Sequence, residues 1–439
     1  MGRLLVLGGT VIDPAANVYR RMNVIVERGT IAAILPLGAR IAPEKGTDRV
    51  LDAAGTWVVP GFIDLHVHLR DPGPGDAETL SSGTRAAAAG GFGTIVCMPN
   101  TNPILDTPAV VAELAGRIRK SKVRVLPAAA ISPGLLGKRL TDFAALLESG
   151  AFCFSDDGVG TARLALLKRA LRQTKRSGRP LLLHCEDPAL SRGGVLHGGP
   201  RARQLGLPGI SASSEVEAVR RVISAAEEVC GPVHIQHVSC AASLELIRRA
   251  KRRKIPVTCE VTPHHLHLSV DHLVCRAAGD GPDPDLKMNP PLRSEADRRA
   301  LLSGLADGTV DAIATDHAPH SAARKGQGFL LAPFGILGLA TALPLTLQLV
   351  RSGVISLTRA IWLLTRGPAT VLGLDAGTLR VGAPADITVV DPDRAYRLEA
   401  RGLKSIAKNT PFLGWDLVGS AKWTLVAGRI VHSLKTPSR

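Results

Sequence analysis

The sequence has few aromatic residues, no long hydrophobic run and no regular cysteine spacing. Phe, Trp and Tyr make up only 3% of its 439 residues, so Ala, Val, Leu and Ile must build most of the core. The longest apolar stretch, Gly335–Val350, is short for a membrane span and contains Pro344 and Gln348. We therefore expect a buried helix there and no association with a membrane.

The cysteines do not form the pattern of a disulfide framework. There are seven, an odd number, and no two have the C-x-x-C spacing. Several lie in apolar, strand-like segments, and Met1–Thr10 lacks the apolar stretch and cleavage site of a signal peptide. These features predict free thiols and a cytoplasmic protein.

The composition is that of an ordinary globular protein with an excess of positive charge. Hydrophobic residues make up 45% and charged residues 21%, which excludes wholesale disorder. The net charge of +16 is compatible with a nucleic acid, an anionic surface or an acidic substrate as partner. However, the densest basic run, Arg248–Lys254, follows an amphipathic segment and is typical of a solvated helix end. With no zinc-finger spacing and few aromatics, we expect no nucleic-acid partner.

The middle of the chain repeats a short apolar strand, a polar cluster and a helical segment. Most of these strands are apolar along their whole length, as strands covered on both faces should be. The repeat predicts an α/β fold, a (β/α)8 TIM barrel. The expected strands are Trp57–Leu69, Thr94–Pro99, Val123–Ala130, Ala151–Ser155, Pro180–His184, Val233–Val238, Pro256–Val261 and Val310–Thr315. The expected helices are Glu78–Ala89, Thr107–Lys120, Thr141–Ser149, Thr161–Ser177, Ser213–Val229, Ala241–Lys254, Ser294–Asp307 and one near Gly335–Val350.

The two ends of the chain differ from the middle. Short strand patterns separated by Gly and Asp-Pro turns occur at both ends, without helices between them. We expect them to pair into one small β-sandwich domain formed by residues 1–56 and 376–439, with the barrel at 57–375.

Polar residues follow several of the predicted barrel strands. Catalytic groups of such barrels lie at the carboxyl ends of the strands. His66 and His68 are two residues apart on a strand, so their side chains point to one face. Either histidine alone could be a buried, hydrogen-bonded residue, but with the other candidates a shared metal site is expected. The further candidates are Asp156 or Asp157, His184, His237 and Asp316. Imidazole and carboxylate ligands suit zinc, with manganese, cobalt or iron as alternatives.

The same rim carries residues suited to catalysis and substrate binding. A carboxylate beside a metal, such as Asp316, can take a proton from water and pass it to a leaving nitrogen. Arg70 can bind a carboxylate, and Asn100, Asn289 and His320 offer further polar groups. The loop Ala332–Gly335 can present backbone groups to a planar ring. We expect Cys185 in the core, Arg293 in a structural ion pair, and His265 and His267 in structural or exposed positions, whereas His264 can approach the rim.

These motifs resemble those of class I dihydroorotases in the amidohydrolase superfamily. The strongest is Pro60–Gly73, PGFIDLHVHLRDPG. Further matches are MPNTN at Met98–Asn102, SDDG at Ser155–Gly158, HCE at His184–Glu186, HVS at His237–Ser239, CEVTPHH at Cys259–His265, NPPLR at Asn289–Arg293, ATDHAPH at Ala314–His320 and APFG at Ala332–Gly335. Gly377–Pro392 resembles the closing strands of the superfamily's sandwich.

The resemblance implies the role of each site residue. His66 and His68 would bind a first zinc ion, His184 and His237 a second, and Asp157 would bridge the two, giving one or two zinc ions per subunit. Asp316 would be the catalytic residue and a further ligand of the first zinc ion. Hydantoinases bridge their metals with a carbamylated lysine, but no lysine lies in residues 150–160, which favours the dihydroorotase branch. The implied substrate contacts are His68, Arg70, Asn100, Asn289, His320, Phe334 and Gly335.

The resemblance also implies the reaction, which is the reversible cyclisation of N-carbamoyl-L-aspartate to (S)-dihydroorotate in pyrimidine biosynthesis. Two alternatives stay open: another cyclic amidase such as an allantoinase or hydantoinase, and a dihydroorotase-like scaffold subunit of aspartate carbamoyltransferase. We expect a homo-oligomer, with aspartate carbamoyltransferase as a potential partner.

Overall fold

Eight parallel strands form a barrel sheet in the computed structural model, which describes residues 2–160, 163–275 and 281–434. The strands follow one another around the sheet in chain order, each paired with its neighbour in parallel. The predicted TIM barrel is therefore confirmed. The strands are β6 (Phe62–Val67), β7 (Phe92–Cys97), β8 (Arg124–Ala130), β9 (Cys153–Ser155), β10 (Leu181–Leu183), β13 (Val233–Ile235), β14 (Val257–Val261) and β15 (Ala312–Ile313).

Contacts between the ends of β6 and β15 bring the first and last barrel strands together. The backbone N–H of His68 donates to the carbonyl of His317 over 2.8 Å, and Val67 and His317 form an isolated parallel bridge. The buried carboxylate of Asp64 accepts hydrogen bonds from the N–H of Thr315 at 3.0 Å and from its hydroxyl at 2.6 Å. This closure places the His-x-His segment beside the segment that carries Asp316.

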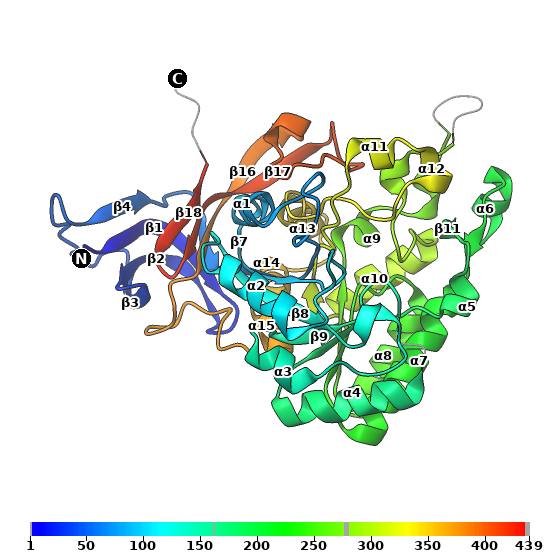
Figure 1. Cartoon of the computed structure of the whole chain (residues 1–439). Helices are drawn as coiled ribbons and strands as arrows, with labels where there is room; N and C mark the ends of the chain where they lie inside the picture. Colours follow the sequence, from blue (N-terminus) through cyan, green and yellow to red (C-terminus); the bar gives the residue numbers. More distant parts are fainter. Residues whose placement is uncertain (1, 161–162, 276–280, 435–439) are drawn as a thin grey trace.

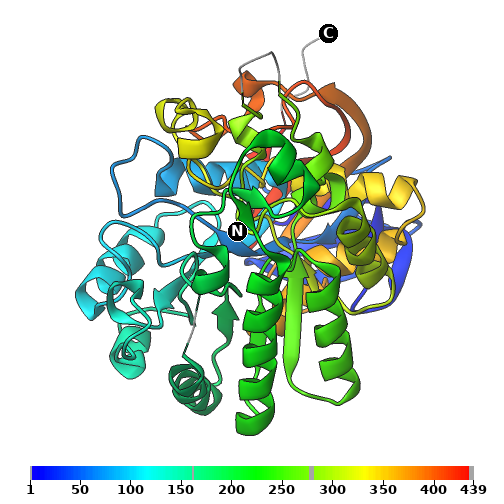
Figure 2. The same cartoon turned by 90° about the vertical axis from the view of Figure 1, so that its right-hand side faces the viewer.

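Helices cover the outside of the barrel, and α7 and α8 stand side by side in Figure 2. Several begin at capping residues that satisfy free backbone N–H groups. Thr79 and Ser294, for example, start their helices with complete capping boxes. The main helices are α1 (Leu80–Gly90), α2 (Pro108–Ile118), α3 (Phe143–Glu148), α4 (Leu164–Ser177), α7 (Ala212–Val229), α8 (Ala241–Arg252), α10 (Glu295–Ala306), α13 (Ala342–Arg351), α14 (Leu357–Leu364) and α15 (Arg366–Leu372). The eight predicted helices correspond to α1, α2, α3, α4, α7, α8, α10 and α13, and α13 begins later than the predicted Gly335, whereas α14 and α15 are not among the predicted helices. The predicted start of α4 at residues 161–162 lies outside the described residues.

Shorter elements decorate the loops around the barrel. The α-helices among them are α5 (Pro188–Ser191), α6 (Pro200–Leu205), α9 (Pro263–His267), α11 (Ala322–Lys325) and α12 (Gly328–Leu331). The 3-10 turns are η1 (Pro133–Leu135), η2 (Val270–His272), η3 (Pro284–Leu286) and η4 (Ala400–Gly402), and β11 (Leu196–His197) pairs with β12 (Gly209–Ile210). No helix in the described part of the chain has the length and apolar character needed to cross a membrane.

Both ends of the chain contribute to a second sheet of eight strands, which extends from the left of Figure 1, where β1 to β4 lie, to β16 and β17 at the top centre. The sequence predicts a single strand over Trp57–Leu69, but the structure divides it. Its first part, β5 (Trp57–Pro60), pairs with β1 (Leu4–Asp13) and β16 (Ile387–Arg397) of the second sheet, and its second part is β6 of the barrel. The remaining members of this sheet are β2 (Val18–Glu27), β3 (Thr30–Pro36), β4 (Arg49–Asp52), β17 (Asp416–Val426) and β18 (Arg429–Ser433). The joint contribution of the two termini agrees with the expected fold class, whereas the domain boundaries stay a prediction.

Small aliphatic side chains make up much of the interior, as the shortage of aromatics requires. One buried cluster joins Leu65 of β6, Ala128 of β8 and Leu182 of β10 with Ala369 and Leu372 of α15. Aromatic contacts are few but specific, such as the edge-to-face pair of Phe62 and Phe92, whose ring centroids are 5.8 Å apart. All seven cysteines are free thiols, and Cys185 is buried, as predicted.

Candidate active site

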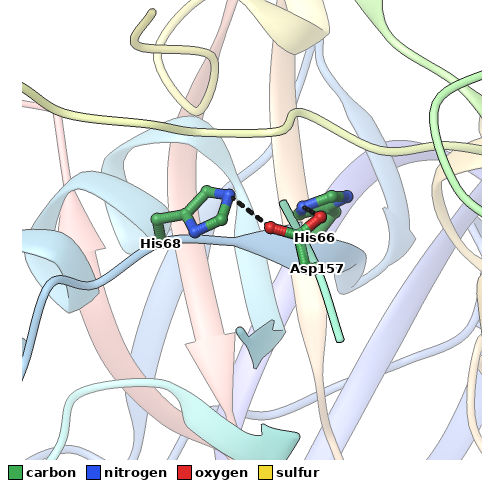
Figure 3. Close-up of side chains that lie close together, drawn as sticks. All are labelled: His66, His68 and Asp157. Atoms are coloured by element: carbon green, nitrogen blue, oxygen red, sulfur yellow. Dashed lines mark ion pairs between the residues drawn. The ribbon is translucent and has the colours of Figure 1, made fainter. Parts of the chain in front are cut away.

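His66, His68 and two aspartates meet where β6 and β15 end. Nε2 of His66 lies 3.3 Å from Oδ1 of Asp157, and Nε2 of His68 lies 3.4 Å from its Oδ2, so each carboxylate oxygen faces one imidazole (Figure 3). Oδ1 of Asp316 lies 3.5 Å from His66 Nε2 and 3.2 Å from His68 Nε2. These four side chains thus enclose a small space between nitrogen and oxygen donors.

A second group of donors shares Asp157 with the first. Nδ1 of His184 lies 2.8 Å from Nε2 of His237, and each of these nitrogens is 3.8 Å from Asp157 Oδ1. His66, His68 and Asp157 satisfy the proximity expected of metal ligands, and so do Asp157, His184 and His237. Six side chains that follow five different strands therefore converge on adjoining positions with one carboxylate in common.

The two adjacent aspartates have different surroundings. Asp156 accepts hydrogen bonds from the backbone N–H of Ile131 at 2.7 Å and from the Ser132 hydroxyl at 2.6 Å, so its carboxylate holds the loop after β8. Asp157, the residue that the resemblance singles out, is the one that lies among the histidines.

Three of the histidines each contact a further polar residue, a different one in each case, through the ring nitrogen that does not face the aspartates. Nδ1 of His66 is 3.2 Å from Glu260 Oε1, and Nδ1 of His68 is 2.8 Å from Asn100 Oδ1. Nε2 of His184 is 2.6 Å from Glu186 Oε2. In the tautomer in which these nitrogens donate to the oxygens, the nitrogen that faces the aspartates keeps a lone pair, as a metal ligand requires. The motifs by themselves indicate no role for Glu260 or Glu186, although Glu186 belongs to the HCE motif and Glu260 lies in β14.

The donor set fits a metal ion. His66 Nε2 is completely buried and makes no hydrogen bond to any described residue, which is costly for a polar atom unless another partner is present. Imidazole nitrogens with carboxylate oxygens and no thiolate are borderline-to-hard ligands suited to a divalent transition metal. The site can therefore hold a metal, and its chemistry alone does not select one.

The electrostatics of the site keep its aspartates ionised. Burial works against ionisation of Asp157, but His66, His237 and His68 outweigh it and hold the pKa of Asp157 well below its ordinary value. Burial opposes ionisation of Asp316 in the same way, and His66 and His68 lower its pKa as well. Both carboxylates are thus charged at neutral pH and available to a cation or a proton.

The predicted substrate residues divide into two groups. Arg70, Asn100 and His320 line one cavity of about 300 Å³, together with Arg324 of α11, which the sequence analysis did not consider. Asn289 is not among the residues that line that cavity, and its amide donates to Glu186 Oε2 over 2.6 Å. Burial lowers the pKa of Arg70 to about 10, so the guanidinium stays charged at neutral pH beside this cavity.

The loop that contains Phe334 and Gly335 packs against His320. The carbonyl of Phe334 lies 2.7 Å from His320 Nε2, and the N–H of Gly335 donates to the carbonyl of Lys287. Gly335 has φ of 121°, and a Cβ there would lie 2.5 Å from that of Ala318. Glycine is therefore required for the close approach of this loop to the site.

Three site residues adopt backbone conformations that are rare for their type. Arg70, His237 and Asp316 have φ of 53°, 33° and 46°. Positive φ costs a non-glycine residue on the order of 1 kcal/mol, and such strain is concentrated at functional sites. The neighbouring packing thus holds all three side chains in place against their local preference.

The other polar candidates have structural surroundings. Arg293 forms the expected ion pair, with its Nη2 3.6 Å from Glu215 Oε2, and both side chains are buried. His265 contacts the Thr262 hydroxyl and the carbonyl of Pro290 through its two ring nitrogens. His264 and His265 are buried, and His267 is half-buried.

Comparison with known proteins identifies the family. The chain is 44% identical over 430 residues to the dihydroorotase of Geobacter sp. (strain M21), covering 98% of this chain and 99% of that protein. It is 47% identical over 413 residues to the dihydroorotase of Bacillus caldolyticus, covering 94% of each. The chain belongs to the dihydroorotase family. Models of a Dihydro-orotase-like family and of the Amidohydrolase family match residues 55–243 and 215–432 of this dihydroorotase-family chain.

Solved structures place the family within a broader fold group. The L-hydantoinase (dihydropyrimidinase) from Arthrobacter aurescens is 25% identical, with a TM-score of 0.85, and covers 99% of this chain and 96% of its own. The D-hydantoinase from Bacillus sp. AR9 is 25% identical, with a TM-score of 0.83, and the match covers 98% of this chain and 95% of that chain. Dihydroorotase-family members thus share their architecture with enzymes of other cyclic amides, so the distinction depends on the site.

Proposed function

We propose that this chain is a dihydroorotase that interconverts N-carbamoyl-L-aspartate and dihydroorotate. The observation that carries the proposal is the pair of histidine groups sharing Asp157, next to a cavity lined by Arg70 and His320. The donor groups suit opening of a cyclic amide, and the cationic cavity suits a ring that carries a carboxylate.

The proposed metal is zinc, with one or two ions per subunit. His66, His68 and Asp316 would hold one ion, His184 and His237 the other, and Asp157 both. When bound, zinc would polarise the amide carbonyl and acidify water. Glu260, Asn100 and Glu186 would orient three of the histidine ligands, since their oxygens accept from the ring nitrogens that face away from the aspartates.

Asp316 is the proposed general base and acid. Its carboxylate is ionised and buried at the rim, so in the hydrolytic direction it can accept the proton of the attacking water and return it to the departing ring nitrogen. Cyclisation uses the same proton path in reverse.

The cavity beside Asp316 is the proposed position of the substrate carboxylate. Arg70 offers a charged, bidentate donor, while Asn100 and His320 line the same cavity and orient the ring. Asn289, His68 and the backbone of Phe334 and Gly335 complete the proposed set. A hydantoinase-like enzyme, which the solved relatives suggest as the second candidate, has no need of a carboxylate-binding arginine at this position.

Replacing Asp316 by Asn tests the assigned chemistry. We expect the variant to lose about 10²- to 10⁴-fold in turnover in both directions, the range of general acid–base catalysis, with an unchanged circular dichroism spectrum. Metal content measured on the same sample separates loss of the base from loss of a ligand. An Asp316→Asn protein that is fully active would refute the role of this residue.

A substrate panel tests the proposed function as a whole. The metal-loaded protein is assayed with carbamoyl aspartate and dihydroorotate and, separately, with hydantoin, dihydrouracil and allantoin. We expect turnover of the first pair only. Preference for an uncharged ring would favour the hydantoinase candidate, and no turnover of any substrate by a metal-loaded protein would favour a scaffold. Light scattering with and without aspartate carbamoyltransferase would test the predicted homo-oligomer and partner.

A further inference from the structure

A second cavity, of about 510 Å³, lies between the barrel and the carboxyl-terminal strands. Its walls come from α1, from β16 and the segment that connects it to β17, and from β17 and β18, which lie in the upper half of Figure 1. None of the described residues that line it is a proposed metal ligand, and none of them lines the cavity that contains Arg70. This cavity is therefore separate from the proposed catalytic chemistry.

The lining of the cavity carries an excess of positive charge. Among the described residues that line it, four cationic side chains, Arg394, Arg397, Arg401 and Lys404, accompany a single carboxylate, Glu399. Arg401 is paired with Glu399. Within the described residues, Arg394, Arg397 and Lys404 have no carboxylate within ion-pair distance. Several cations gathered around one hollow repel one another, and an anion between them would remove that repulsion.

The cavity also offers apolar and neutral polar surface. The Arg394 guanidinium stacks 4.7 Å from the ring centroid of Tyr396, and Leu337 and Leu403 contribute apolar side chains. The buried hydroxyl of Ser420 makes no hydrogen bond to a described residue. Such a combination of a flat aromatic ring, aliphatic walls and a few polar groups is characteristic of small-molecule pockets of about 300–1,000 Å³.

We propose that this cavity binds a phosphorylated small molecule of nucleotide size. The phosphate would lie among Arg397, Lys404 and Arg394, where charge-assisted hydrogen bonds favour a dianion. The flat, less polar part of the ligand would lie against Tyr396 and the leucines. His317 lies on the cavity lining, and its carbonyl accepts from the N–H of His68, so the cavity and the catalytic rim share a structural neighbour.

Calorimetric titration of the metal-loaded protein with AMP, inorganic phosphate and adenosine tests the proposal. AMP supplies both a dianion and a flat ring, and the other two compounds supply one part each. We expect AMP to bind with the highest affinity, phosphate to bind more weakly and adenosine not to bind over the same range. The titration is repeated with saturating dihydroorotate, which should leave AMP binding unchanged.

Two matched pairs of charge reversals locate the site. The first double variant, Arg397→Glu with Lys404→Glu, reverses two exposed cations of the cavity. The control double variant, Arg20→Glu with Arg429→Glu, reverses two exposed arginines of the second sheet that do not line the cavity. We expect at least about tenfold weaker AMP binding in the first protein and less than about twofold change in the second. Arg397→Gln with Lys404→Gln provides a milder version, should the first protein fold poorly.

The outcomes decide the proposal in either direction. AMP binding that survives dihydroorotate and fails only in the cavity variants supports the site. No AMP binding, displacement by dihydroorotate, equal loss in both charge-reversed proteins, or adenosine binding as tight as that of AMP would overturn it. The binding readout does not depend on catalytic activity, so failure of the proposed function would not produce the same result.

Discussion

Glu260 is a buried carboxylate that holds two histidines at once. Its Oε1 lies 3.2 Å from His66 Nδ1 and its Oε2 lies 3.0 Å from His234 Nε2. Burial opposes its charge, but hydrogen bonds from His234 and His66 lower its pKa to about 2. The ionised carboxylate therefore fixes the ring of His66 with Nε2 directed at the aspartates.

Replacing Glu260 by Gln should weaken metal binding without removing a ligand. The amide keeps the shape but loses the charge and places an N–H₂ group against one of the histidines. We expect about 10- to 100-fold lower zinc affinity, as for other residues that orient metal ligands. Competition with a chromophoric chelator measures this effect, with the exposed Glu228→Gln as control. Unchanged affinity would show that Glu260 does not orient His66.

At the level of elements, two glycines end helices in the same conformation but in different surroundings. Gly91 caps α1 with φ of 94°, and Gly178 caps α4 with φ of 65°. A Cβ at Gly91 would lie 2.8 Å from the ring of Phe62 and 2.9 Å from Thr388, whereas nothing lies within 4 Å of one at Gly178. Gly91 thus occurs where the barrel meets β16 of the second sheet.

The pair Gly91→Ala and Gly178→Ala should separate conformational strain from steric overlap. Both variants incur the left-handed penalty of about 1 kcal/mol. Only Gly91→Ala also forces Phe62 or Thr388 to move, which adds about 1–3 kcal/mol. Urea unfolding of the two proteins measures the difference in the free energy of unfolding. Equal losses would mean that the junction accommodates a methyl group.

Lys325 of α11 ties together the loops beside the candidate active site. Its ammonium group donates to the carbonyls of Pro284 at 2.8 Å, Pro333 at 3.1 Å and Lys287 at 3.4 Å. Burial lowers the pKa of Lys325 to about 8. The folded protein thus disfavours the charged form, a cost that is fully present below pH 8 and is relieved as the pH rises towards the unfolded-state pKa of about 10.5.

This titration should be visible in the stability of the protein. Between pH 7.5 and pH 10, Lys325 should add up to about 3 kcal/mol to the free energy of unfolding of the unmodified protein. Lys325→Met should lack this increment. Subtracting the pH-dependent change in its free energy of unfolding from that of the unmodified protein removes the contribution of all other titrating groups. Parallel urea titrations at both pH values measure it. Identical pH dependence in the two proteins would contradict the assignment.

At the scale of the whole molecule, the net charge of +16 favours encounters with anions. Arg70 and Arg324 concentrate part of this charge at the proposed substrate cavity, which is open to screening by salt. An anionic substrate should therefore bind less well as the ionic strength rises.

Raising NaCl from 50 to 500 mM should lower kcat/KM for dihydroorotate by about three- to tenfold, mainly through KM, since exposed charges are screened over about 10 Å at 0.1 M. Sodium sulfate at matched ionic strength controls for specific effects of chloride. A constant kcat/KM across this range would show that the excess charge does not serve substrate capture.

The local pattern of residues was enough to predict the eight barrel strands and the helices between them, because strands covered on both faces are uniformly apolar and amphipathic helices have their own period. The His-x-His segment and Asp316 could be found in the same way, since barrel sites occur where strands end. The division of Trp57–Leu69 could not be predicted, because β5 and β6 are both apolar and only their pairing partners distinguish them.

Chain composition and motif order by themselves determined the fold class, the family resemblance and the residues able to bind a metal. Tertiary structure alone decided how those residues are used. It set Asp157 among the histidines and Asp156 against a loop, brought Glu260 and Glu186 behind the imidazoles, and placed Arg324 beside Arg70. Hydrogen-bond partners between distant segments depend on the path of the whole chain, and local sequence carries no record of that path.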